Sequence, residues 1–127
     1  MDKKIIVTKD APAAIGPYAQ AVQVGQMLYT SGQIPLDPTT GELVADDIKA
    51  QTEQVLKNLQ AVLQAAGSSW ANVVKATIFL TDLADFAVVN ACYQSKLVAP
   101  YPARSCVQVA ALPRGAKIEI EVIARIA

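Results

Sequence analysis

Histidine is absent from this 127-residue sequence, and its absence excludes several kinds of active site. A Ser-His-Asp triad, a Cys-His pair and any zinc site with a histidine ligand all need an imidazole. The two cysteines, Cys92 and Cys106, lack the spacing of a metal site, and we interpret them as reduced thiols. Catalysis in this chain would therefore use carboxylates, arginine, tyrosine, hydroxyls, thiols or backbone groups.

Charged residues are scarce as well, at 17% of the chain, and the 11 basic residues balance the 11 acidic ones. Zero net charge without a basic block argues against a nucleic-acid partner. No apolar run is long enough to span a membrane, and the first ten residues, MDKKIIVTKD, lack the apolar core of a signal peptide. We therefore expect no membrane partner and a cytoplasmic protein, or one inside an organelle.

Hydrophobic periodicity predicts six strands and two helices in the order β-β-β-α-β-α-β-β. Each predicted helix connects two strands, as a crossover connection requires. The first helix begins at an aspartate cap, Asp46 or Asp47, and ends before Gly67, whereas Asp82 caps a second helix over 83–97. The predicted strands cover 3–8, 21–24, 27–32, 72–80, 104–112 and 117–126, with a hairpin turn at Gly25 and Gln26.

Two helices can cover only one face of such a sheet. In the last predicted strand, alternation separates an aliphatic face from a face that mixes acidic and apolar side chains. We expect the helices on the aliphatic face, and the mixed face indicates a subunit interface that contains a site. The aliphatic face holds Ile118, Ile120, Val122, Ala124 and Ile126, and the mixed face holds Glu119, Glu121, Ile123 and Arg125.

The stretch YPARSCVQV, residues 101–109, places Arg104 behind a proline at the start of a predicted strand. A guanidinium matches a carboxylate with two parallel hydrogen bonds, although a structural salt bridge is the more frequent role for an arginine at such a position. Cys106 lies two residues further on and shares the face of Arg104. Without histidine its activation as a thiolate is weakly supported, so we expect its backbone groups to contact ligand and its thiol to pack as an apolar group.

Five segments of the chain together resemble the RidA/YjgF family, the reactive intermediate deaminase A proteins. The resemblance extends from about Ile6 to Ala124 and implies an α+β, chorismate-mutase-like domain over residues 1–127, with a six-stranded mixed sheet. It also implies a homotrimer with active sites in clefts between subunits. The segments are APAAIGPYAQAV, LYTSGQIP, TIFLTDLADFAVVNACY, PARSCVQVAALP and IEIEVIA.

The activity that the resemblance implies is hydrolysis of 2-imino acids, or their enamine tautomers, to 2-keto acids and ammonia. Such substrates, 2-iminobutanoate and 2-iminopropanoate, are released by pyridoxal-phosphate-dependent dehydratases. The resemblance implies neither a cofactor nor a metal. Its motifs assign the substrate carboxylate to Arg104 and the activation of water to Glu119, the first glutamate of EIE. They assign Tyr18, Ser31, Gly32 and Cys106 to substrate binding.

Several alternatives stay open at this stage. Glu119 and Glu121 share one face, so alternation does not choose between them, and we expect Asn90 to bond a neighbouring loop. The segment QSKLVAPY, residues 94–101, is a few residues shorter than the family pattern, which predicts a reshaped loop before Arg104. A non-catalytic or chaperone-like module for keto or imino acids would use the same residues. An endoribonuclease or translation inhibitor, a label this family has carried, is disfavoured by neutral charge and missing histidine.

Overall fold

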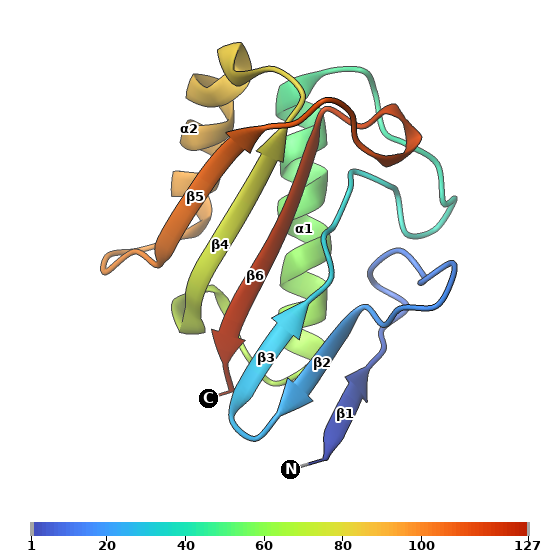
Figure 1. Cartoon of the computed structure of the whole chain (residues 1–127), viewed down its shortest axis with the longest axis vertical. Coiled ribbons are helices and arrows are strands. Elements are labelled where there is room, and N and C mark those ends of the chain that lie inside the picture. The colour runs from blue at the N-terminus through green and yellow to red at the C-terminus, as the bar shows by residue number, and fades with distance from the viewer. Residues whose placement is uncertain (1, 127) are drawn as a thin grey trace.

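The computed structural model describes residues 2–126, which form a six-stranded mixed sheet with two helices on one face (Figure 1). Both features confirm the predicted fold. The strands are β1 (Lys3–Ile6), β2 (Ala21–Val24), β3 (Met27–Thr30), β4 (Val73–Leu80), β5 (Ala103–Gln108) and β6 (Ile118–Arg125), and the helices are α1 (Ile48–Ala65) and α2 (Phe86–Lys96). The strand order is β1-β2-β3-β6-β4-β5, in which only the β4–β5 pair is parallel.

The first helix begins where the aspartate pair predicted it to begin. The Asp47 carboxylate accepts a hydrogen bond from the Ala50 N–H at 2.8 Å, and Gly67 follows the helix end with a φ of 77°. The buried stripe of α1 packs against the sheet. Two residues of α1 with amide side chains, Gln51 and Asn58, are fully buried, which apolar periodicity did not predict.

These two buried amides fix the long loop between β3 and α1. The amide of Asn58 donates to the Leu36 carbonyl at 3.0 Å. Gln51 donates to the Ala45 carbonyl at 3.3 Å and accepts from the Lys117 N–H at 2.9 Å. A buried amide without a hydrogen-bond partner would destabilise the fold. The loop and the start of β6 therefore keep the one arrangement in which these bonds are made.

Several predicted elements are longer than the observed ones, three of them for a visible reason. The first turn of the second predicted helix is a 3₁₀ turn, Leu83–Asp85, and α2 starts at Phe86. The strand predicted over 104–112 ends at Gln108, because β4 ends at Leu80 and offers no further partner. The strand predicted over 3–8 ends at Ile6, because the Thr8 N–H bonds the Gln20 side chain.

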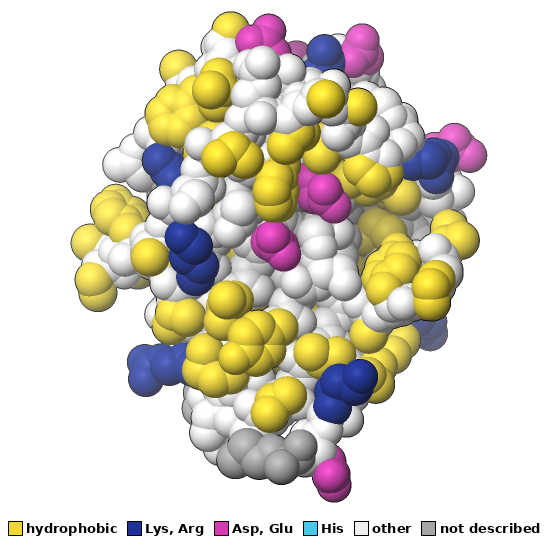
Figure 2. Space-filling view, in the orientation of Figure 1, with side chains coloured by type: hydrophobic (Ala, Val, Ile, Leu, Met, Phe, Trp, Pro, Cys, Tyr) yellow, Lys and Arg dark blue, Asp and Glu magenta, His cyan; other side chains and the backbone are white. Residues whose placement is uncertain are grey.

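The two faces of the sheet differ as alternation predicted. Ile118 and Ile120 are fully buried under the helices. The opposite face is open, and Figure 2 shows apolar side chains around acidic ones in its centre. Tyr29 and Val107 are each 43% exposed there. No helix within residues 2–126 is long and apolar enough to cross a membrane.

Candidate active site

A first cluster of predicted site residues, the Glu119 cluster, lies where the chain leaves β3 and passes the start of β6. It consists of Tyr18, Ser31, Gly32 and Glu119, which line a cavity of about 570 Å³. An isolated bridge outside the strands brings these segments together: the Gln33 N–H donates to the Ile120 carbonyl at 2.8 Å, and the Ile120 N–H donates back at 3.2 Å. Gly32 is therefore held against the side chain of Glu119, the residue before Ile120. The remaining lining residues are Ile15, Ile34, Leu36, Pro113 and Arg114.

Only glycine fits at position 32 with the Glu119 side chain in its present place. A Cβ added to Gly32 would overlap the Glu119 carboxylate and would lie 2.9 Å from its Cγ. Such a distance is shorter than real Cβ contacts, so either the side chain or the backbone would have to move. The absence of a side chain at Gly32 thus gives the carboxylate its place at the cavity.

Glu119 is half-buried, and its surroundings change its acidity. Burial, and secondly the negative charge of Glu121, raise the pKa of the Glu119 carboxyl above its usual range. No hydrogen-bond donor or cation within residues 2–126 pairs with this carboxylate. Glu121 lines a different cavity with Tyr29 and Lys75, so the structure separates the two glutamates that alternation left equivalent.

Tyr18 and Ser31 offer groups of different kinds to the cavity. Tyr18 is 53% exposed, and its hydroxyl oxygen accepts from the Ile15 N–H at 3.4 Å, which leaves the hydroxyl hydrogen free to be donated. The Ser31 hydroxyl donates to the Ala19 carbonyl at 2.6 Å, so its oxygen remains available only as an acceptor. The Tyr18 hydroxyl can therefore donate a hydrogen bond to a ligand, and the Ser31 hydroxyl can accept one from the same ligand.

A second cluster, the Arg104 cluster, lies at the edge of the sheet where β5 faces α2. The Arg104 Nη1 donates to Asn90 Oδ1 at 2.7 Å. The guanidinium carbon lies 5.3 Å from the Phe86 ring centre and 5.2 Å from that of Tyr93, which is cation–π distance. The prediction that Asn90 bonds a loop is wrong, because its partner is Arg104 on the neighbouring strand.

That Phe86, Asn90 and Tyr93 of α2 surround Arg104 was not predicted from the sequence. The i, i+4, i+7 pattern does indicate a shared face. What lies against that face is a tertiary contact that spacing does not reveal. The cavity beside the guanidinium has a volume of about 420 Å³ and is lined by Asn90, Tyr93, Gln94, Tyr101, Pro102 and Arg104.

Cys106 lies on the same face of β5 as Arg104, as predicted. These two residues pair with Ile78 and Ala76 of β4, both of which are buried beneath the helices. Burial raises the pKa of the Cys106 thiol, and the opposing effect of the Arg104 charge is smaller. The thiol is therefore protonated at neutral pH, which argues against a thiolate nucleophile.

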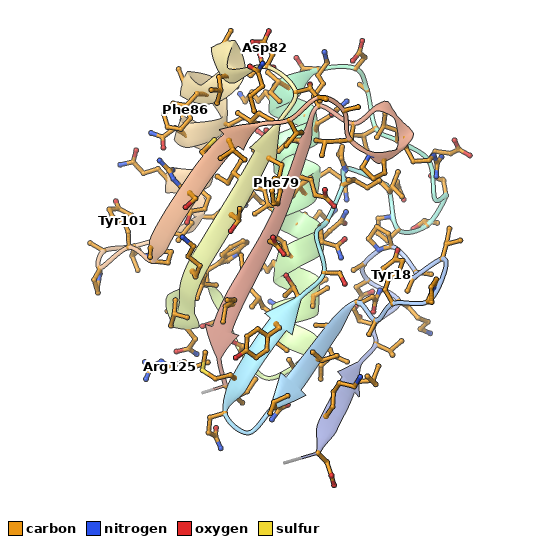
Figure 3. The ribbon with its side chains drawn as sticks, viewed as in Figure 1. Tyr18, Phe79, Asp82, Phe86, Tyr101 and Arg125 are labelled. Carbon is orange, nitrogen blue, oxygen red and sulfur yellow. The ribbon has the colours of Figure 1, made fainter. Side chains whose placement is uncertain are left out.

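Within one chain the two clusters do not meet. Arg104 pairs with Ala76 and Glu119 with Phe79, three residues further along β4, so the two side chains leave opposite faces of the sheet. The clusters also lie apart along the sheet, since Figure 3 shows Phe86 of the Arg104 cluster at the upper left and Tyr18 of the Glu119 cluster at the right. One chain therefore holds the two charged residues in two separate clusters, which are called the Arg104 and Glu119 half-sites in the proposal below.

The fold and the two clusters define a single-domain α+β protein with an exposed guanidinium beside a cavity at one sheet edge and a half-buried carboxyl group on the open face. Comparison with known proteins specifies this further, since the model of the family described as Endoribonuclease L-PSP matches residues 8–126. The chain belongs to this family, which is the RidA/YjgF family indicated by its motifs.

Relatives and solved structures match over almost the whole chain. A Salmonella typhimurium protein named 2-iminobutanoate/2-iminopropanoate deaminase is 55% identical over 124 residues, which cover 95% of this chain and 96% of the relative. A Mus musculus protein of the same name is 52% identical, covering 96% and 90%. A crystal structure of RidA from a Psychrobacter species has a TM-score of 0.93 and 53% identity, covering 97% and 99%.

Proposed function

We propose that this chain hydrolyses 2-imino acids such as 2-iminobutanoate and 2-iminopropanoate to 2-keto acids and ammonia. The observation that carries the proposal is the chemistry of the two half-sites. A guanidinium at the edge of β5 suits the carboxylate of the substrate, and a half-buried carboxylate without a cation partner among residues 2–126 suits a base for water. Relatives that bear this activity in their names are 52–55% identical to the chain.

In the proposed reaction, Arg104 binds the substrate carboxylate and Glu119 takes a proton from a water molecule. The water oxygen bonds to C2, and the electron pair of the C=N bond moves to nitrogen, which is protonated by Glu119. Glu119 then transfers the hydroxyl proton of the resulting carbinolamine to its amino nitrogen, the C–N bond breaks, and ammonia leaves as the C=O bond of the keto acid forms. Water is the only co-reactant, so atoms and charges balance without a cofactor.

We further propose that the site forms between copies of the chain in a homotrimer. The Arg104 and Glu119 half-sites face opposite sides of one sheet, so a site containing both needs two chains. The Arg104 cluster lies on an edge strand, where a neighbouring chain can reach it. The exposed apolar side chains of the open face, Tyr29 and Val107 among them, provide surface for such an interface.

The activity is tested with a threonine dehydratase reaction that contains semicarbazide, which traps free imine before it hydrolyses. We expect the purified protein to lower the amount of trapped imine and to raise the initial rate of 2-oxobutanoate formation. Unchanged trapping together with saturable binding of 2-oxobutanoate would favour a binding module instead. RNA cleavage that is lost with an Arg104→Ala substitution would favour the endoribonuclease alternative.

The pH dependence of the reaction should reflect the raised pKa of Glu119. Glu119 acts as a base only when ionised, so kcat should rise with pH through the folded-state pKa and then level off. The acidic limb should lie at a higher pH than an ordinary glutamate would give. Rates measured from pH 4 to 8, with the uncatalysed rate subtracted at each pH, check this (the range brackets the usual glutamate value of about 4.3). A limb at or below the usual glutamate range would contradict the assignment.

Gly32→Ala should reduce kcat by about 10- to 100-fold, because the added methyl displaces the Glu119 carboxylate from the cavity. The melting temperature should change little, since the displaced group is a flexible side chain. A double-mutant cycle supplies the control: adding Gly32→Ala to Glu119→Gln should cause little further loss, because both changes act through one group. Full activity in Gly32→Ala would show that the position of this carboxylate does not matter.

A further inference from the structure

We propose that Asn90 is a positioning residue that orients Arg104 without cancelling its charge. In this arrangement the side-on edge of the guanidinium, Nε and Nη2, is the edge that receives the substrate carboxylate. This inference rests on the proposed function and goes further, because it specifies the residue that sets the binding geometry and the atoms that bind.

The hydrogen bonds of Arg104 indicate which edge is free. A guanidinium has five N–H donors in a planar fork and can grip a carboxylate end-on or side-on. The bond from Nη1 to Asn90 Oδ1 at 2.7 Å uses one of the two N–H groups of a nitrogen on the end-on edge, so that edge has lost a donor. Within residues 2–126, neither Nε nor Nη2 has a hydrogen-bond or ion-pair partner. The side-on pair is therefore complete and unoccupied.

All the groups that hold Arg104 are uncharged. Asn90 contributes an amide oxygen, while Phe86 and Tyr93 contribute ring faces that attract a cation without using its N–H donors. A carboxylate in the place of Asn90 would hold the guanidinium equally well and would also neutralise it. The neutral amide thus keeps the positive charge available for an anionic ligand.

A single element carries the whole set. Phe86, Asn90 and Tyr93 all belong to α2, and Tyr93 is buried, with only 4% of its surface exposed. The guanidinium itself remains exposed beside the cavity of about 420 Å³. The orientation of Arg104 is therefore set by a helix packed on the core and not by the loop that precedes β5.

Calorimetric titration with 2-oxobutanoate, the keto acid with the same carboxylate, separates positioning from a merely structural role. Asn90→Ala should weaken binding about tenfold through loss of a charge-assisted bond. Asn90→Asp keeps the acceptor for Arg104, so its melting temperature should equal or exceed that of the wild type. Its affinity for 2-oxobutanoate should nevertheless fall further, by about 100-fold, because the new ion pair with Arg104 competes with the ligand. Asn72→Ala, the same truncation in the short helix Trp70–Asn72, should bind like the wild type.

Two results would overturn the inference. One is wild-type affinity in Asn90→Ala, and the other is wild-type affinity in Asn90→Asp, which is what a purely structural bond to Arg104 predicts. Wild-type protein that shows no binding at all would overturn both this inference and the Arg104 half-site. Imine trapping in the dehydratase assay is measured separately. If the wild type lowers imine trapping while both Asn90 variants bind 2-oxobutanoate as the wild type does, the proposed function stands and this inference alone is rejected.

Discussion

Arg104→Ala should lower kcat/KM for imine hydrolysis by about 10²- to 10³-fold, because it removes two charge-assisted hydrogen bonds to the substrate carboxylate. The loss should fall mainly on KM, since the carboxylate keeps its charge throughout the reaction and is bound equally in the ground and transition states. Initial rates over a range of dehydratase flux, with semicarbazide as competitor, measure the two constants. The fold should survive, because the Arg104 side chain is exposed.

Two further variants make the Arg104 result specific. Arg104→Lys keeps the charge but loses the planar fork, so its activity should fall between those of the wild type and Arg104→Ala. Arg125→Ala is the matched control, an exposed arginine at the last position of β6 (labelled in Figure 3), whereas Glu119 is the second residue of that strand. Equal losses in Arg104→Ala and Arg125→Ala would point to a general electrostatic effect and would contradict a carboxylate clamp.

Glu119→Gln should lower kcat by about 10²- to 10⁴-fold, the usual contribution of a positioned acid–base group, while KM changes little. The same change should raise stability at neutral pH. The pKa of this carboxyl is higher in the folded chain than in the unfolded one, so its stabilising contribution exists below the unfolded pKa and is lost as the pH rises through the folded pKa. Above that pKa the ionised group opposes folding, and glutamine removes this penalty.

A rise in melting temperature together with a fall in kcat would exclude misfolding as the reason for lost activity. Glu121→Gln is the control on the same strand and the same face. It should retain activity, and because Glu121 contributes to the raised pKa of Glu119, the acidic limb of its pH profile should move to lower pH. A Glu121→Gln variant as inactive as Glu119→Gln would mean that the two carboxylates act as a pair.

Much of the fold could be predicted because local chemistry determines it. Alternation in the last strand placed Ile118 and Ile120 under the helices, and an aspartate pair placed the start of α1 at Asp46 or Asp47, of which the structure uses Asp47. Element ends were less predictable where they depend on a partner. The sequence pattern of a strand continues from Arg104 past Gln108, but β5 pairs with β4 only as far as Leu80, where β4 ends.

The candidate site could be predicted only in part, for a related reason. Motifs pointed to Arg104 and Glu119, and alternation put Cys106 beside Arg104. Alternation did not distinguish Glu119 from Glu121, because only Glu119 lies against Gly32. The bridge between Gln33 and Ile120, two residues far apart in the sequence, brings Gly32 to β6. Nor did spacing reveal Asn90 as the partner of Arg104, since the contact joins a helix to a neighbouring strand.

The most direct test of the account is complementation between two inactive chains. Arg104→Ala and Glu119→Gln chains are co-expressed with different affinity tags, and oligomers that carry both tags are isolated and assayed for imine hydrolysis. If each site takes Arg104 from one copy and Glu119 from the next, every mixed trimer contains one intact site and should show about one third of the wild-type rate. Activity no higher than that of either parent would contradict a site shared between copies.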